Sequence, residues 1–192
     1  MLALIALVVS FVLALSGVAV GQSTTQKQAS TVDADLRPFH QAVEQYITLH
    51  RRLRQEIPEL TPGSDAKQLN TTSDALARAI QRARPKARQG DFFSAAPTRV
   101  IKQRIQELLQ NPAYRDLLTG IDDEPPKVGV PRIYLRYPDG AQLATMPPTL
   151  LQALPPLPPE LEYRIVGRFL VLRDTHASLI LDYIAQVVPA RP

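Results

Sequence analysis

Residues 161–184 read LEYRIVGRFLVLRDTHASLILDYI, and two strand-like runs in this stretch flank a Gly-Arg pair. A two-residue loop at Gly167 and Arg168 suits a type II′ turn, because glycine adopts the positive φ that the first loop position needs. This turn sets the register and places Val166 opposite Phe169. The stretch therefore predicts an antiparallel hairpin.

The same register divides the hairpin into two faces, because directly opposed residues share a face. Glu162 and Arg173 oppose each other and are expected to form an ion pair on the polar face. The sequence DTHA at 174–177 predicts a reverse turn into a third strand, Ser178–Ile184. The expected apolar face consists of Leu161, Tyr163, Ile165, Leu170 and Leu172.

A meander of three strands needs an apolar cover to be stable. The nearest apolar material is the LPPLPP segment at 154–159, preceded by one or two helical turns that begin at Pro147. We expect this segment and the leucines Leu150, Leu151 and Leu154 to pack across the sheet.

The chain upstream of this region has helical periodicity. Apolar residues recur at three- and four-residue steps, which predicts an amphipathic helix over 33–56. Further helices are expected from Ser73 to Pro85, over 97–110, and from Asn111 to Gly120, where Asn111 caps the helix and Pro112 lies in its first turn. We expect these helices to form an antiparallel bundle. The inward residues are expected to be Leu36, Phe39, Val43, Tyr46, Ile47, His50, Leu53 and Ile57, then Leu76, Ala79, Ile80 and Ala83, then Val100, Ile101, Ile105, Leu108 and Leu109.

Prolines separate the two regions. Ten of the 18 prolines lie between Pro125 and Pro159, where RIYLRY at 132–137 alternates as a strand does and is followed by the turn PDGA. The predicted fold class is α+β: a helical domain at 33–124, divided near Glu124 from a proline-rich crossover and small C-terminal β-meander at 125–192.

The N-terminal segment Met1–Gly21 is almost wholly apolar and ends in small residues, which predicts a signal peptide cleaved before Gln22. An uncleaved membrane anchor is the alternative, because no basic residue precedes the apolar run. The polar residues 22–32 are expected to form a flexible linker. Either reading predicts an exported protein, periplasmic or secreted, with no cysteine for a disulfide or a lipid anchor.

The C-terminal part resembles a group of uncharacterised exported bacterial proteins. The resemblance rests on the YP-x-G turn at 137–140, MPP at 146–148, LPPLP at 154–158, and LEYRIVGR followed by LVLRD. Ser178 stands where that pattern commonly has Asn. The meander is also more distantly similar to small periplasmic proteins linked to nickel and cobalt homeostasis. The first resemblance includes no residues of assigned function.

Candidate metal ligands are few. Asp174, His176 and Asp182 offer oxygen and imidazole donors, but a turn aspartate that binds its own backbone explains Asp174 without a metal. His40 and Glu44 have the spacing of an ordinary surface pair on a helix. His40 and His50 lie about 80° out of line at 100° per residue and are not expected to share an ion. We therefore expect no metal and no cofactor.

Basic residues are concentrated in the helical region. Between Arg78 and Arg104 there are eight Lys or Arg residues against Asp91 alone, a net charge of +7. Such a surface attracts anionic membranes and polymers. No nucleic-acid-binding motif accompanies it, so an anionic envelope component or a protein is the expected partner. The candidate contacts are Arg82, Arg84, Lys86 and Arg88; the alternative is a solvated basic face without a specific partner.

No sequence motif indicates catalysis: GxSxG, HExxH and a phosphate-binding glycine loop are all missing. The sequence favours a non-catalytic interaction or structural protein of the bacterial cell envelope. A metal-linked periplasmic accessory protein and a hydrolase without a recognisable motif are the alternatives.

Overall fold

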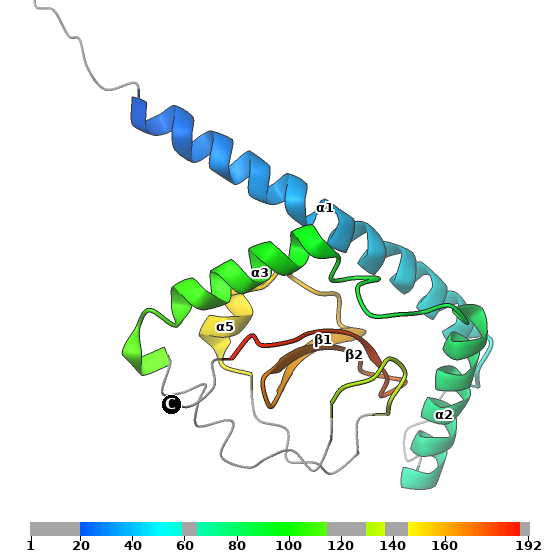
Figure 1. Ribbon diagram of the computed structural model, residues 1–192. Helices are drawn as coiled ribbons and strands as arrows, with labels where there is room; N and C mark the ends of the chain where they lie inside the picture. The colour runs from blue at the N-terminus through cyan, green and yellow to red at the C-terminus, as the bar shows by residue number, and fades with distance from the viewer. Residues whose placement is uncertain (1–19, 59–64, 115–129, 137–145, 189–192) are drawn as a thin grey trace, which may run out of the picture.

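The computed structural model describes residues 20–58, 65–114, 130–136 and 146–188, and within them the chain has an α+β fold (Figure 1). The order of elements along the chain confirms the predicted class, with helices first and a three-stranded antiparallel sheet at the C-terminal end. The helices are α1 (Val20–Gln55), α2 (Ala66–Ala83), α3 (Ala95–Leu108) and α5 (Pro148–Ala153). The strands are β1 (Leu161–Val166), β2 (Phe169–Asp174) and β3 (Ile180–Ile184).

The β1–β2 hairpin has the predicted register, from Val166 opposite Phe169 to Leu161 opposite Asp174. Gly167 has a φ of 53° and Arg168 is not among the residues with positive φ, as a type II′ turn requires.

The third strand begins two residues later than expected. Arg173 pairs with Ile180 and Leu172 with Asp182, so Leu181 is the extra residue of a β-bulge. Because Asp182 lies opposite Leu172, it shares the face that Leu172 directs into the core.

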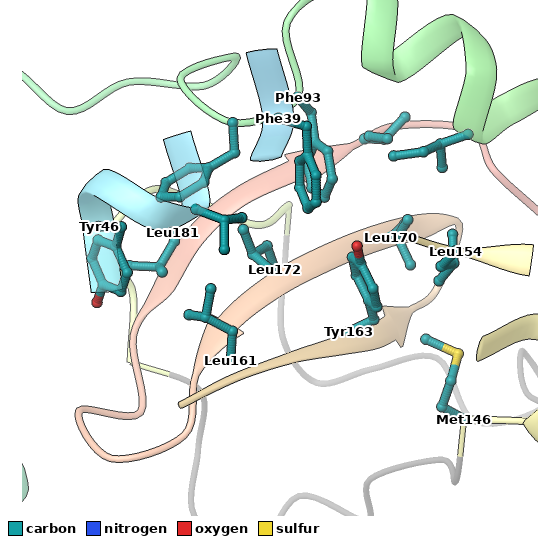
Figure 2. Packing of buried hydrophobic residues seen from close by; sticks show 14 of the residues in the cluster. Phe39, Tyr46, Phe93, Met146, Leu154, Leu161, Tyr163, Leu170, Leu172 and Leu181 are labelled. Atoms are coloured by element: carbon teal, nitrogen blue, oxygen red, sulfur yellow. The ribbon is translucent and has the colours of Figure 1, made fainter. Parts of the chain in front are cut away.

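The predicted apolar face is buried, and every one of its five side chains is at most 6% exposed. Its cover comes from the helices as well as from the proline-rich segment: Phe39 and Tyr46 of α1 lie over the sheet residues (Figure 2), and Leu157 packs against the same cluster. Leu150 and Leu154 are buried in the same cluster, as expected. Leu151 is 44% exposed, so the prediction that it packs on the sheet was wrong.

Helix α1 follows its predicted stripe, with Leu36 through Leu53 buried at each expected position and Ile57 half-buried. It begins at Val20, much earlier than expected. The prediction of a flexible linker at 22–32 was therefore wrong. No glycine or proline lies between Gly21 and Pro38, so nothing in that segment interrupts the helix.

Helix α2 also begins earlier than expected, at Ala66 rather than near Ser73. The side chain of Asp65 accepts a 2.8 Å hydrogen bond from the N–H of Gln68, and the Gln68 side chain accepts one from the Asp65 N–H. This capping box supplies the start signal that the apolar pattern missed. Ala83, expected to face inward, is exposed at the end of the helix.

Helix α3 is displaced by two residues from the expected span and buries Val100, Ile101 and Ile105, with Leu109 just beyond its end. The short helix expected after it begins as predicted at Pro112, where the N–H of Ala113 donates to the side chain of Asn111. Its expected end at Gly120 lies outside the described residues, as do the turn PDGA and the boundary at Glu124.

The helices do not enclose a core of their own. One cluster of buried residues contains side chains from α1, α2, α3, α5 and all three strands. Figure 1 shows α1 and α3 on the same side of the sheet, with α2 beside the C-terminal end of α1. The arrangement is thus a helical layer on a sheet rather than the expected antiparallel bundle.

The strand predicted at 132–137 was also wrong. Of its described residues, 132–136, Arg136 alone forms a bridge, to Leu179, and Tyr134 has a φ of 65° within a turn. The segment nevertheless borders β3, because Tyr134 N–H donates to the Ile180 carbonyl at 2.8 Å. Leu135 packs on a small second cluster behind the sheet, formed by Val166, Val171 and Ile180. The alternating residues of this segment therefore predict a strand, but contacts with β3 and the second cluster hold it as a turn.

Candidate functional site

The candidate anionic-partner contacts lie at the C-terminal end of α2 and in the loop that follows it. Arg82, Lys86 and Arg88 are exposed, whereas Arg84 is not. No described residue forms an ion pair with Arg82 or Lys86, and the contact of Arg88 with Asp91 is long, at 3.8 Å. Arg78 is also exposed and lies one helical turn before Arg82. We call Arg78, Arg82, Lys86 and Arg88 the basic surface.

Arg84 has a structural role instead. Its guanidinium carbon lies 5.5 Å from the ring centroid of Tyr46 and 5.1 Å from that of Phe92. Nη2 of Arg84 also donates a 3.1 Å hydrogen bond to Asp91. A cation held over two aromatic rings contributes to the packing of the fold. Arg84, one of the four expected partner contacts, is therefore engaged within the chain.

The loop that carries the basic surface is fixed to the sheet by Asp182. Its carboxylate accepts hydrogen bonds from the N–H groups of Gly90 at 2.9 Å, Phe92 at 2.9 Å and Phe93 at 2.8 Å. Asp182 is fully buried; burial raises its pKa, and these backbone donors oppose that rise. The carbonyl of Arg84 in turn accepts a 2.9 Å bond from the Tyr134 hydroxyl. The basic side chains therefore project from a well-anchored backbone.

A second cluster of polar side chains lies where α1 meets the turn between β2 and β3. Nε2 of His50 lies 3.3 Å from Oδ2 of Asp174 and 3.4 Å from Nδ1 of His176, and the two imidazole rings stack at 5.3 Å. The Tyr46 hydroxyl donates a 2.6 Å bond to the same Oδ2. We call His50, Asp174 and His176 the His-Asp-His cluster.

The turn holds Asp174 as the sequence predicts. Oδ1 of Asp174 accepts the N–H of His176 at 2.8 Å and that of Ala177 at 2.6 Å. With the Tyr46 bond to Oδ2, both carboxylate oxygens are engaged and their directions are fixed. His50 and Asp174 are buried, while His176 is exposed, so the cluster opens to solvent at one side.

The surroundings of His50 favour the neutral form of its imidazole. Burial lowers the pKa of His50; the Asp174 carboxylate opposes this shift, and the His176 ring adds to it. A neutral imidazole is the form that binds metal ions. Nδ1 of His50 and Oε2 of the neighbouring buried Glu160 have no hydrogen-bond partner among the described residues.

Part of this cluster could be predicted from the sequence. Asp174 and His176 are expected as candidate ligands together with Asp182, but Asp182 binds the 90–93 backbone and is not a member. His50 is not among the expected ligands, because 126 residues separate that histidine from His176. The inward position of His50 on α1 was the one available signal. His40 and Glu44 are both exposed, as the surface-pair interpretation expects.

An open pocket of about 290 Å³ adjoins the exposed side of the cluster. Its lining includes Arg54 from α1, Leu76 from α2, and Thr175, His176 and Ser178 from the turn. A solute therefore has access to His176. A second pocket, of about 450 Å³, lies on the proline-rich side between Met146 and Tyr163.

A scan against protein-family models, a search of curated proteins and a search of solved structures each find no match to the chain. The resemblances drawn from the C-terminal sequence therefore stay predictions. Within the described part of the chain, no helix has the length and hydropathy needed to cross a bilayer.

Proposed function

We propose that the protein is an exported, non-catalytic interaction protein of the bacterial cell envelope, and that its basic surface contacts an anionic envelope component. The observation that carries the proposal is the exposure of Arg78, Arg82, Lys86 and Arg88 on one helix end and its following loop. The proposal of export rests on the apolar segment Met1–Gly21.

Charge balance supports the contact. Asp91 is the one acidic residue between Arg78 and Arg104, and Arg84 engages it at 3.1 Å. The positive electrostatic field of the exposed bases is therefore not neutralised by acidic residues of the same segment. Such a field acts within a Debye length, about 8 Å at physiological ionic strength.

The anchored backbone beneath the basic surface also supports the proposed contact. Asp182 and Tyr134 tie the loop to the sheet, so binding costs little ordering of the chain. A disordered basic tail would lose more conformational freedom on docking.

Vesicle co-sedimentation tests the proposal. The full chain is mixed with vesicles of phosphatidylcholine, with or without phosphatidylglycerol, at about 50 mM and about 500 mM salt. The same protein is also mixed with envelope fragments stripped of lipid, which separates binding to lipid headgroups from binding to an acidic polymer. Binding through Met1–Gly21 is insensitive to salt, so only the salt-sensitive fraction is counted.

The proposal predicts that salt-sensitive binding appears only with an anionic target, either the charged vesicles or the fragments. Equal binding to charged and neutral vesicles, together with salt-insensitive binding to fragments, would contradict it.

A further inference from the structure

The His-Asp-His cluster brings three metal-binding donor atoms together. Each of His50, Asp174 and His176 offers one donor atom, and these three atoms lie within 4.8 Å of one another. The donors come from two distant segments, α1 and the β2–β3 turn, and the fold alone brings them together.

The separations agree with the size of a tetrahedral ion. Zinc bonds to nitrogen and oxygen are about 2.0–2.1 Å long, which places neighbouring ligands of a tetrahedron roughly 3.3–3.4 Å apart. The distances of 3.3 Å from His50 to Asp174 and 3.4 Å from His50 to His176 match this spacing. The separations between His50 and each of the other two donors therefore match the ligand spacing of a tetrahedral ion.

The carboxylate of the cluster has the supporting contacts that a metal ligand needs. Tyr46 holds the ligating oxygen of Asp174, and the turn backbone holds the other oxygen. Such outer partners fix the direction of a ligand and strengthen binding. The buried Glu160 side chain also lies close to His50; its Oε1 accepts a 2.7 Å hydrogen bond from Arg51, and its Oε2 has no partner among the described residues.

We propose that His50, Asp174 and His176 form a binding site for a divalent transition-metal ion such as Zn²⁺, with a further coordination position open toward solvent. Two imidazoles and one carboxylate favour such ions over Mg²⁺ and Ca²⁺, which take oxygen ligands. The open position lies on the side of the exposed His176 and the adjoining pocket. The site is independent of the basic surface.

Isothermal titration calorimetry of the full chain with zinc chloride tests this site. We expect one ion per chain with a dissociation constant below about 1 μM. His176→Ala is the informative variant, because His176 is exposed and its loss does not open the core. His40→Ala is the matched control, since His40 is an exposed histidine of α1 outside the cluster.

His176→Ala is expected to weaken zinc binding by more than about 100-fold, and Tyr46→Phe by about 10–100-fold, as loss of an outer partner does. His40→Ala is expected to bind as the parent does. Circular dichroism of each variant checks that it is folded. Absence of stoichiometric binding to the parent would overturn the proposal, as would equal affinity of the parent and His176→Ala. Equal weakening by His40→Ala would also overturn it, by showing that zinc binds surface histidines without a defined site.

Discussion

The hydroxyl of Tyr46 donates a 2.6 Å hydrogen bond to Oδ2 of Asp174, a residue 128 positions further along the chain. Both side chains are buried. Burial raises the pKa of Tyr46 well above its usual range, and the Asp174 carboxylate raises it further, so the hydroxyl remains a donor. This bond joins the helical layer to the end of β2 and orients the carboxylate of the His-Asp-His cluster.

Tyr46→Phe should therefore destabilise the fold. Removal of a hydrogen bond to a buried charged group costs about 1.5–3 kcal/mol. Tyr163→Phe is the matched control, because the Tyr163 hydroxyl donates to a neutral carbonyl, that of Pro155, at 3.0 Å, and its loss costs about 0.5–1.5 kcal/mol. The measurement is the free energy of unfolding in urea. A Tyr46→Phe protein as stable as the parent would refute this role for the bond.

The parts of the fold that could be predicted from sequence are those set by local rules. The Gly167–Arg168 loop fixes the hairpin register through its turn type, and the spacing of apolar residues identifies the buried stripe of α1. Both signals act over a few residues, so no knowledge of distant contacts is needed.

The parts that could not be predicted depend on contacts between distant segments. His50 meets His176 only because α1 crosses the sheet beside the turn. Arg84 is indistinguishable from Arg82 in sequence, yet its guanidinium lies over Tyr46 and Phe92. Asp182 lies among strand residues, where no local pattern shows that it will bind the backbone of a loop about 90 residues earlier.

Replacement of Arg84 should separate its structural role from that of the exposed bases. Arg84→Gln removes a partly desolvated cation from two rings and from Asp91, at a cost of about 1–3 kcal/mol. Arg82→Gln removes the same charge from an exposed position and should change the free energy of unfolding by less than about 0.5 kcal/mol. Urea denaturation measures both. Equal effects of the two substitutions would show that the ring contacts of Arg84 contribute nothing.

Stability should fall as the pH drops below about 6.5. The pKa of His50 is lowered in the folded state from a usual value of 6.5, mainly by burial. Below that pH the unfolded chain binds a proton that the folded chain does not, so the free energy of unfolding decreases, by up to about 1.4 kcal/mol per pH unit. The loss ends once the pH passes below the pKa of His50 in the folded state.

Urea denaturation between pH 7.5 and pH 5, with a chelator present, measures this slope, and His50→Gln should remove it. The titration of Glu160 and Glu162 does not contribute to the change in stability between pH 7.5 and pH 5. Arg51 lowers the pKa of Glu160 below its usual value of 4.5, and Arg164 and Arg173 lower that of Glu162 against the effect of burial. The stability these two carboxylates contribute is present above about pH 4.5 and is lost only below it. An unchanged slope in His50→Gln would assign the pH dependence to another group.

A comparison of two triple variants at equal net charge tests the central claim most directly. R82Q/K86Q/R88Q removes three bases from the basic surface and leaves Arg84 in place. R37Q/R52Q/K67Q removes three exposed bases from α1 and the start of α2. The measurement is the salt-sensitive fraction of each protein that sediments with anionic vesicles and with envelope fragments. The account predicts that the first variant loses more than half of this fraction on the target that the parent binds, while the second retains it. Equal retention by both variants, or equal loss, would contradict docking through the basic surface.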